Sequence, residues 1–256
     1  MRRILTAEGI GVATARRLIA SLGSPEAVVE ASPSALAGVP GLNATSAALI
    51  AAAIKASNPN RELQALRSCG GRFVPWDGDE YPPELCRIPD PPPLLRVRGE
   101  PWDPASPAVA LVGTRRCSAY GRRQAIRFAG ACAASGVVVV SGGARGIDAA
   151  VHQAVIRSGG RTVAVLGSGL GCPYPPEHES LFDDIVASGG SVISEFPTTA
   201  PPRPGQFPRR NRIVSGLSRG VLIIEAPRRS GALITARLAV EDQGRDAWVV
   251  PGPVEG

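Results

Sequence analysis

The chain has 256 residues, which is enough for one large domain or for a large domain joined to a small one. Hydrophobic residues make up 44% of it and aromatic residues 4%, so the composition excludes a largely disordered protein and predicts an aliphatic core. The net charge of +6 comes almost entirely from arginine, and five arginines but no acidic residue lie between Glu195 and Glu225. Such a stretch suits a polyanion, because one arginine can contact a phosphate through two N–H groups.

Cysteines and apolar runs exclude several further classes. The five cysteines are odd in number and lack C-x-x-C spacing, so neither a disulfide framework nor a zinc site is expected. The N-terminus has no apolar signal-peptide core, and no apolar run reaches the length of a membrane span. The sequence therefore predicts a cytoplasmic protein with reduced thiols, no metal site and no membrane contact.

Residues 1–60 are expected to form a small all-helical domain. Helical segments at 13–22, 25–31, 33–37 and 44–56 are separated by glycine and proline turns. The turns at 9–11 and 39–42 resemble those of helix-hairpin-helix and SAM-like domains, whose turn amides can hold a DNA phosphate. A compact helical turn without a ligand remains the alternative interpretation.

Residues 61–107 are expected to be a proline-rich connector. Six prolines between positions 82 and 93 fit neither a helix interior nor a central strand. Short strands are expected at 72–75 and 94–98, and the segment is expected to pack along the domain that follows it.

Residues 108–256 are expected to form a doubly wound, Rossmann-like α/β domain with a parallel-rich sheet. Nearly all-apolar runs at 108–112, 137–140, 162–166, 191–193, 221–224 and 247–250 predict strands buried on both faces. Helical segments at 118–134, 147–158, 178–188, 209–218 and 232–243 alternate with them. Ligands of such sheets lie beyond the carboxyl ends of the strands, so the residues that follow each strand are the candidates for a site.

Glycines and arginines follow several of these strands and predict an extended anion site. Glycine lets the backbone approach a ligand closely, and a helix that starts there presents unpaired N–H groups. Tight turns that happen to use glycine are the alternative. The candidate binding residues are Gly113, Thr114, Arg115 and Ser118 after the first strand, Ser141, Gly142, Gly143, Arg145 and Gly146 after the second, and Phe207, Arg210, Asn211 and Arg212 after the fourth.

Enzymatic readings find little support in the sequence. The spacing of Gly142, Gly143 and Gly146 is not the G-x-G-x-x-G of dinucleotide-binding folds, and no P-loop or G-x-S-x-G string occurs. His152 lies inside a predicted helix, where a structural role is expected. We therefore expect no catalytic residue, no metal and no cofactor.

Taken together, the ordered motifs resemble the DNA-processing protein A family, DprA or Smf. The family strings VGSRxxSxYG, SGxAxGID, YPxxN, FPxRNRII and SGxLITA…GRxVxAVPG correspond here to 112–121, 141–148, 174–178, 207–214 and 230–252. Thr114, His178 and Ala232 depart from the usual residues. The chain ends shortly after the usual PG, so the final family segments are expected to be missing.

The resemblance implies sequence-independent binding of single-stranded DNA by a homodimer. It also implies protection of incoming DNA and loading of the RecA recombinase in natural transformation. A nucleotide- or nucleoside-phosphate-binding hydrolase of a related Rossmann family is the alternative. That family uses PGGxGTxxE, whereas residues 226–232 here contain no glutamate.

Overall fold

The N-terminal unit is a set of short helices whose ends are fixed by local caps. In the computed structural model, which describes residues 2–7, 9–100, 103, 106–228 and 230–252, it comprises α1 (Arg2–Leu5), α2 (Val12–Leu22), α3 (Pro25–Glu30), α4 (Pro33–Ala37) and α5 (Ala44–Ala56). Ser24, Ser32 and Asn43 each accept a hydrogen bond from a backbone N–H in the first turn of the helix they precede. The helical N-terminal domain predicted from the sequence is therefore confirmed.

Residues 61–107, expected to be a connector, contribute one helix and two strands. They contain most of α6 (Pro59–Ser68), then β1 (Gly71–Pro75), a 3-10 turn at Leu85–Arg87 and β2 (Leu94–Gly99). The two strands confirm the short strands expected there, whereas α6 was not predicted. β2 pairs antiparallel with β6, so this segment extends the sheet of the following domain.

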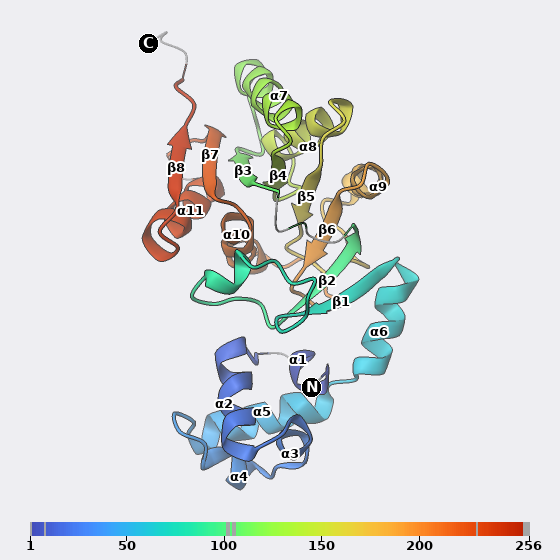
Figure 1. Ribbon diagram of the computed structural model, residues 1–256, viewed down its shortest axis with the longest axis vertical. Helices are drawn as coiled ribbons and strands as arrows, with labels where there is room; N and C mark the ends of the chain where they lie inside the picture. The colour runs from blue at the N-terminus through green and yellow to red at the C-terminus, as the bar shows by residue number, and fades with distance from the viewer. Residues whose placement is uncertain (1, 8, 101–102, 104–105, 229, 253–256) are drawn as a thin grey trace.

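One eight-stranded sheet runs through the larger part of the molecule in the order β1-β2-β6-β5-β4-β3-β7-β8 (Figure 1). The strands from the second half of the sequence are β3 (Ala108–Gly113), β4 (Val138–Ser141), β5 (Thr162–Val165), β6 (Ser191–Ser194), β7 (Gly220–Glu225) and β8 (Asp246–Val249). These six strands are parallel to one another, and every residue of β4, β5 and β6 is buried. The predicted α/β Rossmann-like architecture is confirmed.

Helices cover both faces of the sheet. α7 (Ala119–Ala134), α8 (Ile147–Arg157) and α9 (Glu179–Ala187) pack side by side on one face, and Leu111 of β3 lies in the apolar cluster beneath α7 and α8. A 3-10 turn at Pro176–His178 precedes α9. α10 (Gln206–Gly216), α11 (Gly231–Arg237) and the π-helical turn Leu238–Asp242 lie on the other face, where Ala110 and Val112 pack. The chain changes face after β6, so the strand order reverses between β3 and β7.

A buried ion pair joins α6, the sheet and the loop that leads to α10. Arg96 of β2 has only 3% of its side chain exposed, and its Nε lies 2.7 Å from Oε1 of Glu62 on α6. The same carboxylate oxygen accepts hydrogen bonds from the backbone N–H and the hydroxyl of Thr198. The helical unit also packs on this edge of the sheet, because Leu94 joins its apolar core and Arg16 stacks on Trp76.

No helix in the described ranges is long and apolar enough to cross a membrane.

Replacing Arg96 by alanine is expected to destabilise the fold by about 3 kcal/mol, because it leaves the Glu62 carboxylate largely buried without its cation. Urea unfolding followed by circular dichroism measures the change. Arg87→Ala is the matched control, since its ion pair with Glu84 is 72% exposed on the arginine side and should contribute less than about 1 kcal/mol. Equal losses in the two variants would contradict a special role for the buried pair.

Candidate nucleic-acid interface

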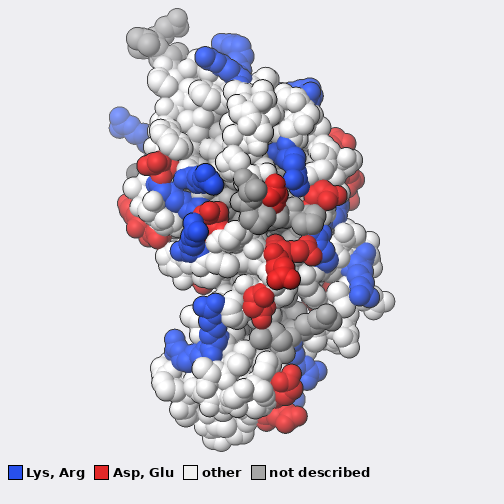
Figure 2. All heavy atoms as spheres, in the orientation of Figure 1, with Lys and Arg blue, Asp and Glu red and all other residues white. Residues whose placement is uncertain are grey.

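The carboxyl ends of β3 and β4 and the first turns of α10 enclose a pocket of about 630 Å³. It lies where the strand order reverses, which is the usual ligand position in doubly wound sheets. On the face seen in Figure 2, arginine and acidic side chains are interspersed, so the net charge is not gathered there. We call this hollow, with the crevice beside it, the strand-end pocket. The predicted site residues that line it are Gly113, Thr114, Arg115, Gly142, Arg145, Phe207, Arg210 and Asn211.

The guanidinium of Arg210 forms the inner wall of the strand-end pocket. Arg210 is only 5% exposed, and no ion pair within 4 Å is found for it among the described residues. Burial lowers the pKa of Arg210 to about 10, with the Asp148 carboxylate opposing this shift and Arg115 adding to it. The group therefore remains cationic at neutral pH. A buried cation whose nearest countercharge is held at a distance favours an entering anion.

Gly142 makes room for this guanidinium. A Cβ atom built on Gly142 would lie 2.6 Å from Cζ of Arg210 and closer still to Nη1. Two of the loop amides, however, are not free for the anion cradle that the sequence suggested. The N–H groups of Gly142 and Ala144 donate to Oδ2 of the buried Asp148, at 3.1 and 3.3 Å. That expectation is wrong at these two positions, because a helical carboxylate already accepts from the amides.

Arg115 and two aromatic rings form the mouth of the pocket. The guanidinium carbon of the exposed Arg115 lies 5.2 Å from the ring centroid of Phe207, and the Phe207 ring lies 5.6 Å from that of Tyr174. Phe207 is half-buried, so one part of the ring faces the pocket while another packs against Gly167. Within the described ranges Arg115 has no carboxylate partner, so its charge is available to a ligand.

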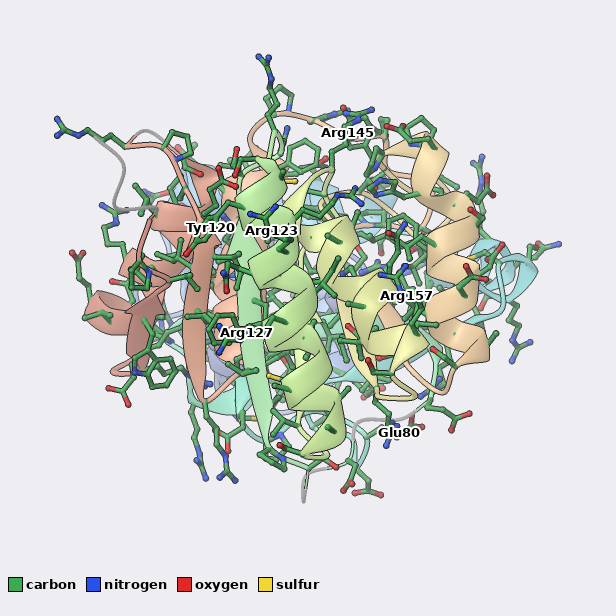
Figure 3. All side chains as sticks on the ribbon, turned by 90° about the horizontal axis from the view of Figure 1, so that it is seen from above. Glu80, Tyr120, Arg123, Arg127, Arg145 and Arg157 are labelled. Carbon is green, nitrogen blue, oxygen red and sulfur yellow. The ribbon has the colours of Figure 1, made fainter. Side chains whose placement is uncertain are left out.

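Arg145 lies at the same edge of the sheet, where Figure 3 labels it, but its charge is neutralised. Its guanidinium forms two hydrogen bonds with the carboxylate of Glu177 and one with the hydroxyl of Tyr174. The pKa of Glu177 is lowered, first by its hydrogen bond from Arg145. Arg145 therefore positions the Tyr174 ring and adds little net positive charge to the pocket.

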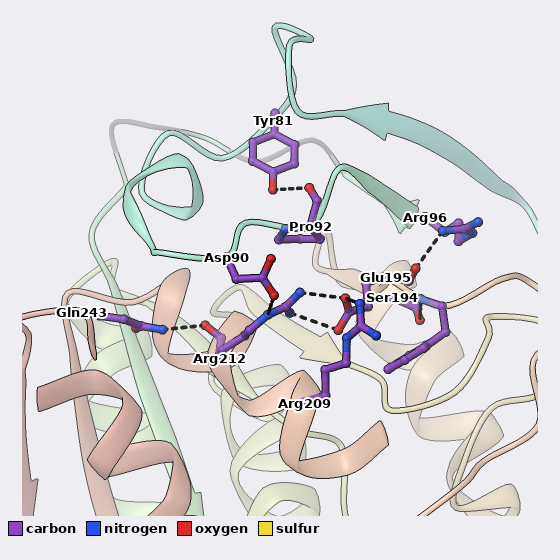
Figure 4. Close-up of polar contacts among 10 residues, drawn as sticks. Tyr81, Asp90, Pro92, Arg96, Ser194, Glu195, Arg209, Arg212 and Gln243 are labelled. Carbon is purple, nitrogen blue, oxygen red and sulfur yellow. Dashed lines mark hydrogen bonds and ion pairs between the residues drawn. The ribbon is translucent and has the colours of Figure 1, made fainter. Parts of the chain in front are cut away.

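Arg212 lies outside the strand-end pocket, so its predicted place beside Arg115 and Arg210 is wrong. Its guanidinium donates to both carboxylate oxygens of Glu195, at 3.0 and 2.8 Å, and to Asp90 (Figure 4). Arg212 follows Arg210 by two positions, and two residues on an α-helix correspond to a rotation of about 200°. The two side chains therefore leave α10 on opposite sides, and Arg212 braces the helix against the residue after β6 and the loop before β2.

Four other predicted residues support the pocket from outside its lining. Ser118 caps α7 through the N–H of Gly121, and the hydroxyl of the buried Ser141 donates to the carbonyl of Leu111. Gly146 has φ of +78° and passes against the Thr114 backbone, where no Cβ would fit. Gly143 lies against the ring of Phe182. These residues shape the loops, and the hydroxyls of Ser118 and Ser141 already have hydrogen-bond partners.

Sequence reasoning did not assign Tyr174 and Arg116 to the site, although both line the pocket. Arg116 adjoins Arg115, and Tyr174 follows the glycine-rich turn after β5. Two amides of that turn are already used, because those of Gly169 and Gly171 donate to the carbonyls of Ala200 and Thr198. Tyr174, the aromatic residue beyond these glycines, is the feature of the sequence that could have indicated this part of the site.

Neither histidine is placed as a general base. His152 is buried, and its Nδ1–H donates to Thr162 Oγ1 at 2.8 Å because that hydroxyl donates to the Val139 carbonyl. Burial, with further contributions from His178 and Arg210, lowers the pKa of His152 to about 3. His178 donates to the carbonyl of Gly143 and so holds the loop after β4.

A larger hollow, of about 1090 Å³, lies between α5, α6 and the loop after β6. Among the described residues that line it, only Arg61 and Glu62 are charged, and their charges are opposite. It therefore lacks the excess of positive charge that a phosphate chain requires, whereas the strand-end pocket has it.

Two family models match the chain. The model for DNA recombination-mediator protein A matches residues 72–256, from β1 onward. The chain belongs to this family. The model for a SAM-like helix-hairpin-helix tandem matches residues 1–56, in agreement with the helical unit.

Curated relatives of this DprA/Smf family cover most of the chain. Protein Smf of Escherichia coli K12 is 46% identical over 182 residues, which are 71% of this chain and 48% of that protein. Protein Smf of Synechocystis is 40% identical over 248 residues, or 95% of this chain and 62% of that protein. The chain thus spans between about half and three fifths of the length of these relatives.

Two solved structures of DNA processing protein A have the same fold. That of the Streptococcus pneumoniae protein is 30% identical, has a TM-score of 0.76, and covers 99% of this chain and 88% of that chain. That of the Helicobacter pylori protein is 29% identical, has a TM-score of 0.62, and covers 72% and 83%. The second is described by its single-stranded DNA binding mode.

Gly142→Ala is expected to destabilise the protein by about 1–3 kcal/mol, because the added methyl group overlaps the buried Arg210 guanidinium. The cost should shrink in an Arg210→Ala background, where the overlap is gone, and a double-mutant cycle in urea measures this coupling. Gly205→Ala is the control, since nothing lies within 4 Å of its added atom. Additive costs in the cycle would rule out the proposed contact.

His152 is expected to make the fold less stable as pH falls. Its pKa of about 3 in the folded state lies below the ordinary value of 6.5, so between these values the unfolded chain binds the proton and the folded chain does not. The free energy of unfolding should therefore drop by about 2 kcal/mol from pH 7 to pH 5 through this group. Urea titrations at both pH values should show a smaller drop in His152→Gln than in the parent or in His178→Gln. An unchanged drop in His152→Gln would refute the assignment.

Proposed function

We propose that the chain binds single-stranded DNA, without sequence preference, through phosphates held in the strand-end pocket. The observation that carries the proposal is the pairing of Arg115, exposed and without a carboxylate partner in the described ranges, with the buried cation of Arg210 in one hollow. Phe207 lies beside Arg115 and lines the same hollow, where its ring can stack on a base of any identity. The similarity to the Helicobacter pylori protein, whose structure is described by its single-stranded DNA binding mode, supports the same ligand.

The geometry of the pocket favours a single strand over a duplex. Arg210 is 5% exposed and lines a recess together with Arg115, Tyr174 and Phe207. A flexible strand can bend its phosphates into this recess and turn its bases onto the rings, whereas the stiff duplex cannot. Thr114, Gly113 and Asn211 complete the proposed binding surface as pocket-lining residues. Arg212 is proposed only to hold α10 in position.

Family membership extends this proposal to the biological role. We infer that the whole protein acts in the cytoplasm as a homodimer that protects incoming single strands and loads RecA during natural transformation. The edge strand β8 supports association between copies, because within the described residues it pairs with β7 alone and exposes Trp248 and Val249 by 51% and 65%. The chain is proposed to bind its ligand without chemistry, since Asp148 and His152 are both buried and already hydrogen-bonded.

Arg115→Ala is expected to weaken binding of single-stranded oligothymidylate by about one to two decades in Kd, because one charge-assisted phosphate contact is lost. Fluorescence anisotropy across a salt series measures this, and the log–log slope should flatten by about 0.7. Arg67→Ala on α6 is the matched control, an exposed arginine without an ion pair in the described part of the chain. If Arg115→Ala binds like the parent at matched salt, the pocket is not the binding site.

A further inference from the structure

We propose that the outer face of α7 is a second part of the nucleic-acid interface, along which a single strand continues after it leaves the strand-end pocket. The proposal rests on the proposed function, because it extends the path of the same ligand. Arg123 and Arg127 carry it: both are exposed, they lie one helical turn apart, and no ion pair is found for either among the described residues. Figure 3 shows both along the helix that faces the viewer.

The surface formed by α7 and α8 exposes arginine and no acid. α7 contains Arg122, Arg123 and Arg127 and no acidic residue at all, and α8 adds the exposed Arg157. The one acidic residue of α8, Asp148, is buried at the pocket. A solvated helix surface normally mixes both signs so that ion pairs form along it. A face of one sign, left without partners, repels itself unless a polyanion neutralises it.

Most other charged side chains around the pocket are either acidic or already paired, which disfavours a DNA strand on those sides. On the same side of the sheet, the neighbouring α9 presents the exposed acids Glu179, Asp183 and Asp184 to solvent. Arg145, between the pocket and α9, is already paired with Glu177. On the opposite side of the sheet, Arg209 pairs with Glu195 and Arg237 with Glu241. Arg203 and Arg228 are single exposed arginines in loops beside the pocket, without an ion pair in the described residues. Among the helices around the pocket, however, only α7 and α8 present unpaired arginines with no exposed acid in the described residues.

The α7 face is continuous with the pocket mouth. Arg115 and Arg116 line the pocket and come just before α7, whose first residue is Ala119. From Arg123 to Arg127 the helix rises by about 6 Å, a spacing suited to successive phosphates of an extended strand. Ile126 lies between them and is 40% exposed, which offers an apolar contact to a sugar or a base. The outer face of α7 therefore offers positive charge to phosphates and apolar surface to a sugar or a base.

The test compares the double variant Arg123→Gln, Arg127→Gln with the parent on two oligothymidylates, one of about six nucleotides that fills the pocket and one of about 20 that reaches beyond it. Glutamine keeps helix propensity and removes only the charges. For the longer strand we expect about tenfold weaker binding and a salt slope reduced by about 1.4, or about 0.7 for each arginine. Binding of the shorter strand should stay unchanged. Arg67→Gln, Arg219→Gln removes the same charge far from α7 and should affect neither.

Each other result overturns the proposal. If the α7 double variant binds both oligonucleotides like the parent, the strand does not follow α7. This result is also what we would expect if the α7 face bound an acidic protein and not DNA. If it weakens both equally, the arginines act only through the overall charge or through the pocket. Arg115→Ala is measured in parallel on the shorter strand, so a failure of the pocket itself is seen separately. Circular dichroism melting checks that the variants are folded.

Discussion

The site depends on one buried guanidinium. Arg210 lies beneath the surface with Gly142 against it and Asp148 as its nearest opposing charge, too distant for an ion pair within 4 Å. Burial of a cation costs free energy unless the surroundings compensate for it, and here the compensation is partial. Asp148 is held in place by the amides of Gly142 and Ala144, so the loop after β4, the start of α8 and α10 are fixed together around this charge. The pocket is therefore electropositive before any ligand arrives.

The position of α10 follows from a second set of contacts on its other side. Arg212 and Arg209 both bind Glu195, which directly follows β6, and the backbone of Glu195 accepts from Arg96 (Figure 4). Arg96 in turn holds Glu62 of α6. The helix that carries Phe207 and Arg210 is thus anchored through the sheet edge to the first helix after the N-terminal unit. This chain of contacts gives Arg212 a structural role, and it explains an arginine-rich helix in which only one arginine faces the pocket.

Much of the fold could be predicted because the signals were local. Proline at the first turn and serine or asparagine caps define α3, α4 and α5 to within a residue, and all-apolar runs define the buried strands. Part of the site could also be predicted from the sequence, because strand ends of a parallel sheet meet at one edge: Arg115, Gly142, Phe207 and Arg210 all line the hollow.

Other parts of the site could not be predicted. Arg212 was misplaced because both the rotation of the helix and the partner Glu195 had to be known. The roles of Ser141 and the Gly142 amide were misjudged because their hydrogen-bond partners, Leu111 and Asp148, are set by packing.

By itself the sequence determined the order of helices and strands from residue 108 onward, the parallel character of the sheet there and the edge at which a ligand would lie, because these follow from the hydrophobic period and the rule of strand ends. Only the tertiary structure decided which charges remain available. An arginine's availability depends on the carboxylates that packing brings within reach, and these come from distant parts of the chain: Glu177 neutralises Arg145 and Glu195 neutralises Arg212. No such partner is brought to Arg115, Arg123 or Arg127 in the described residues, and electrostatic pairing in three dimensions leaves them as the positive surface.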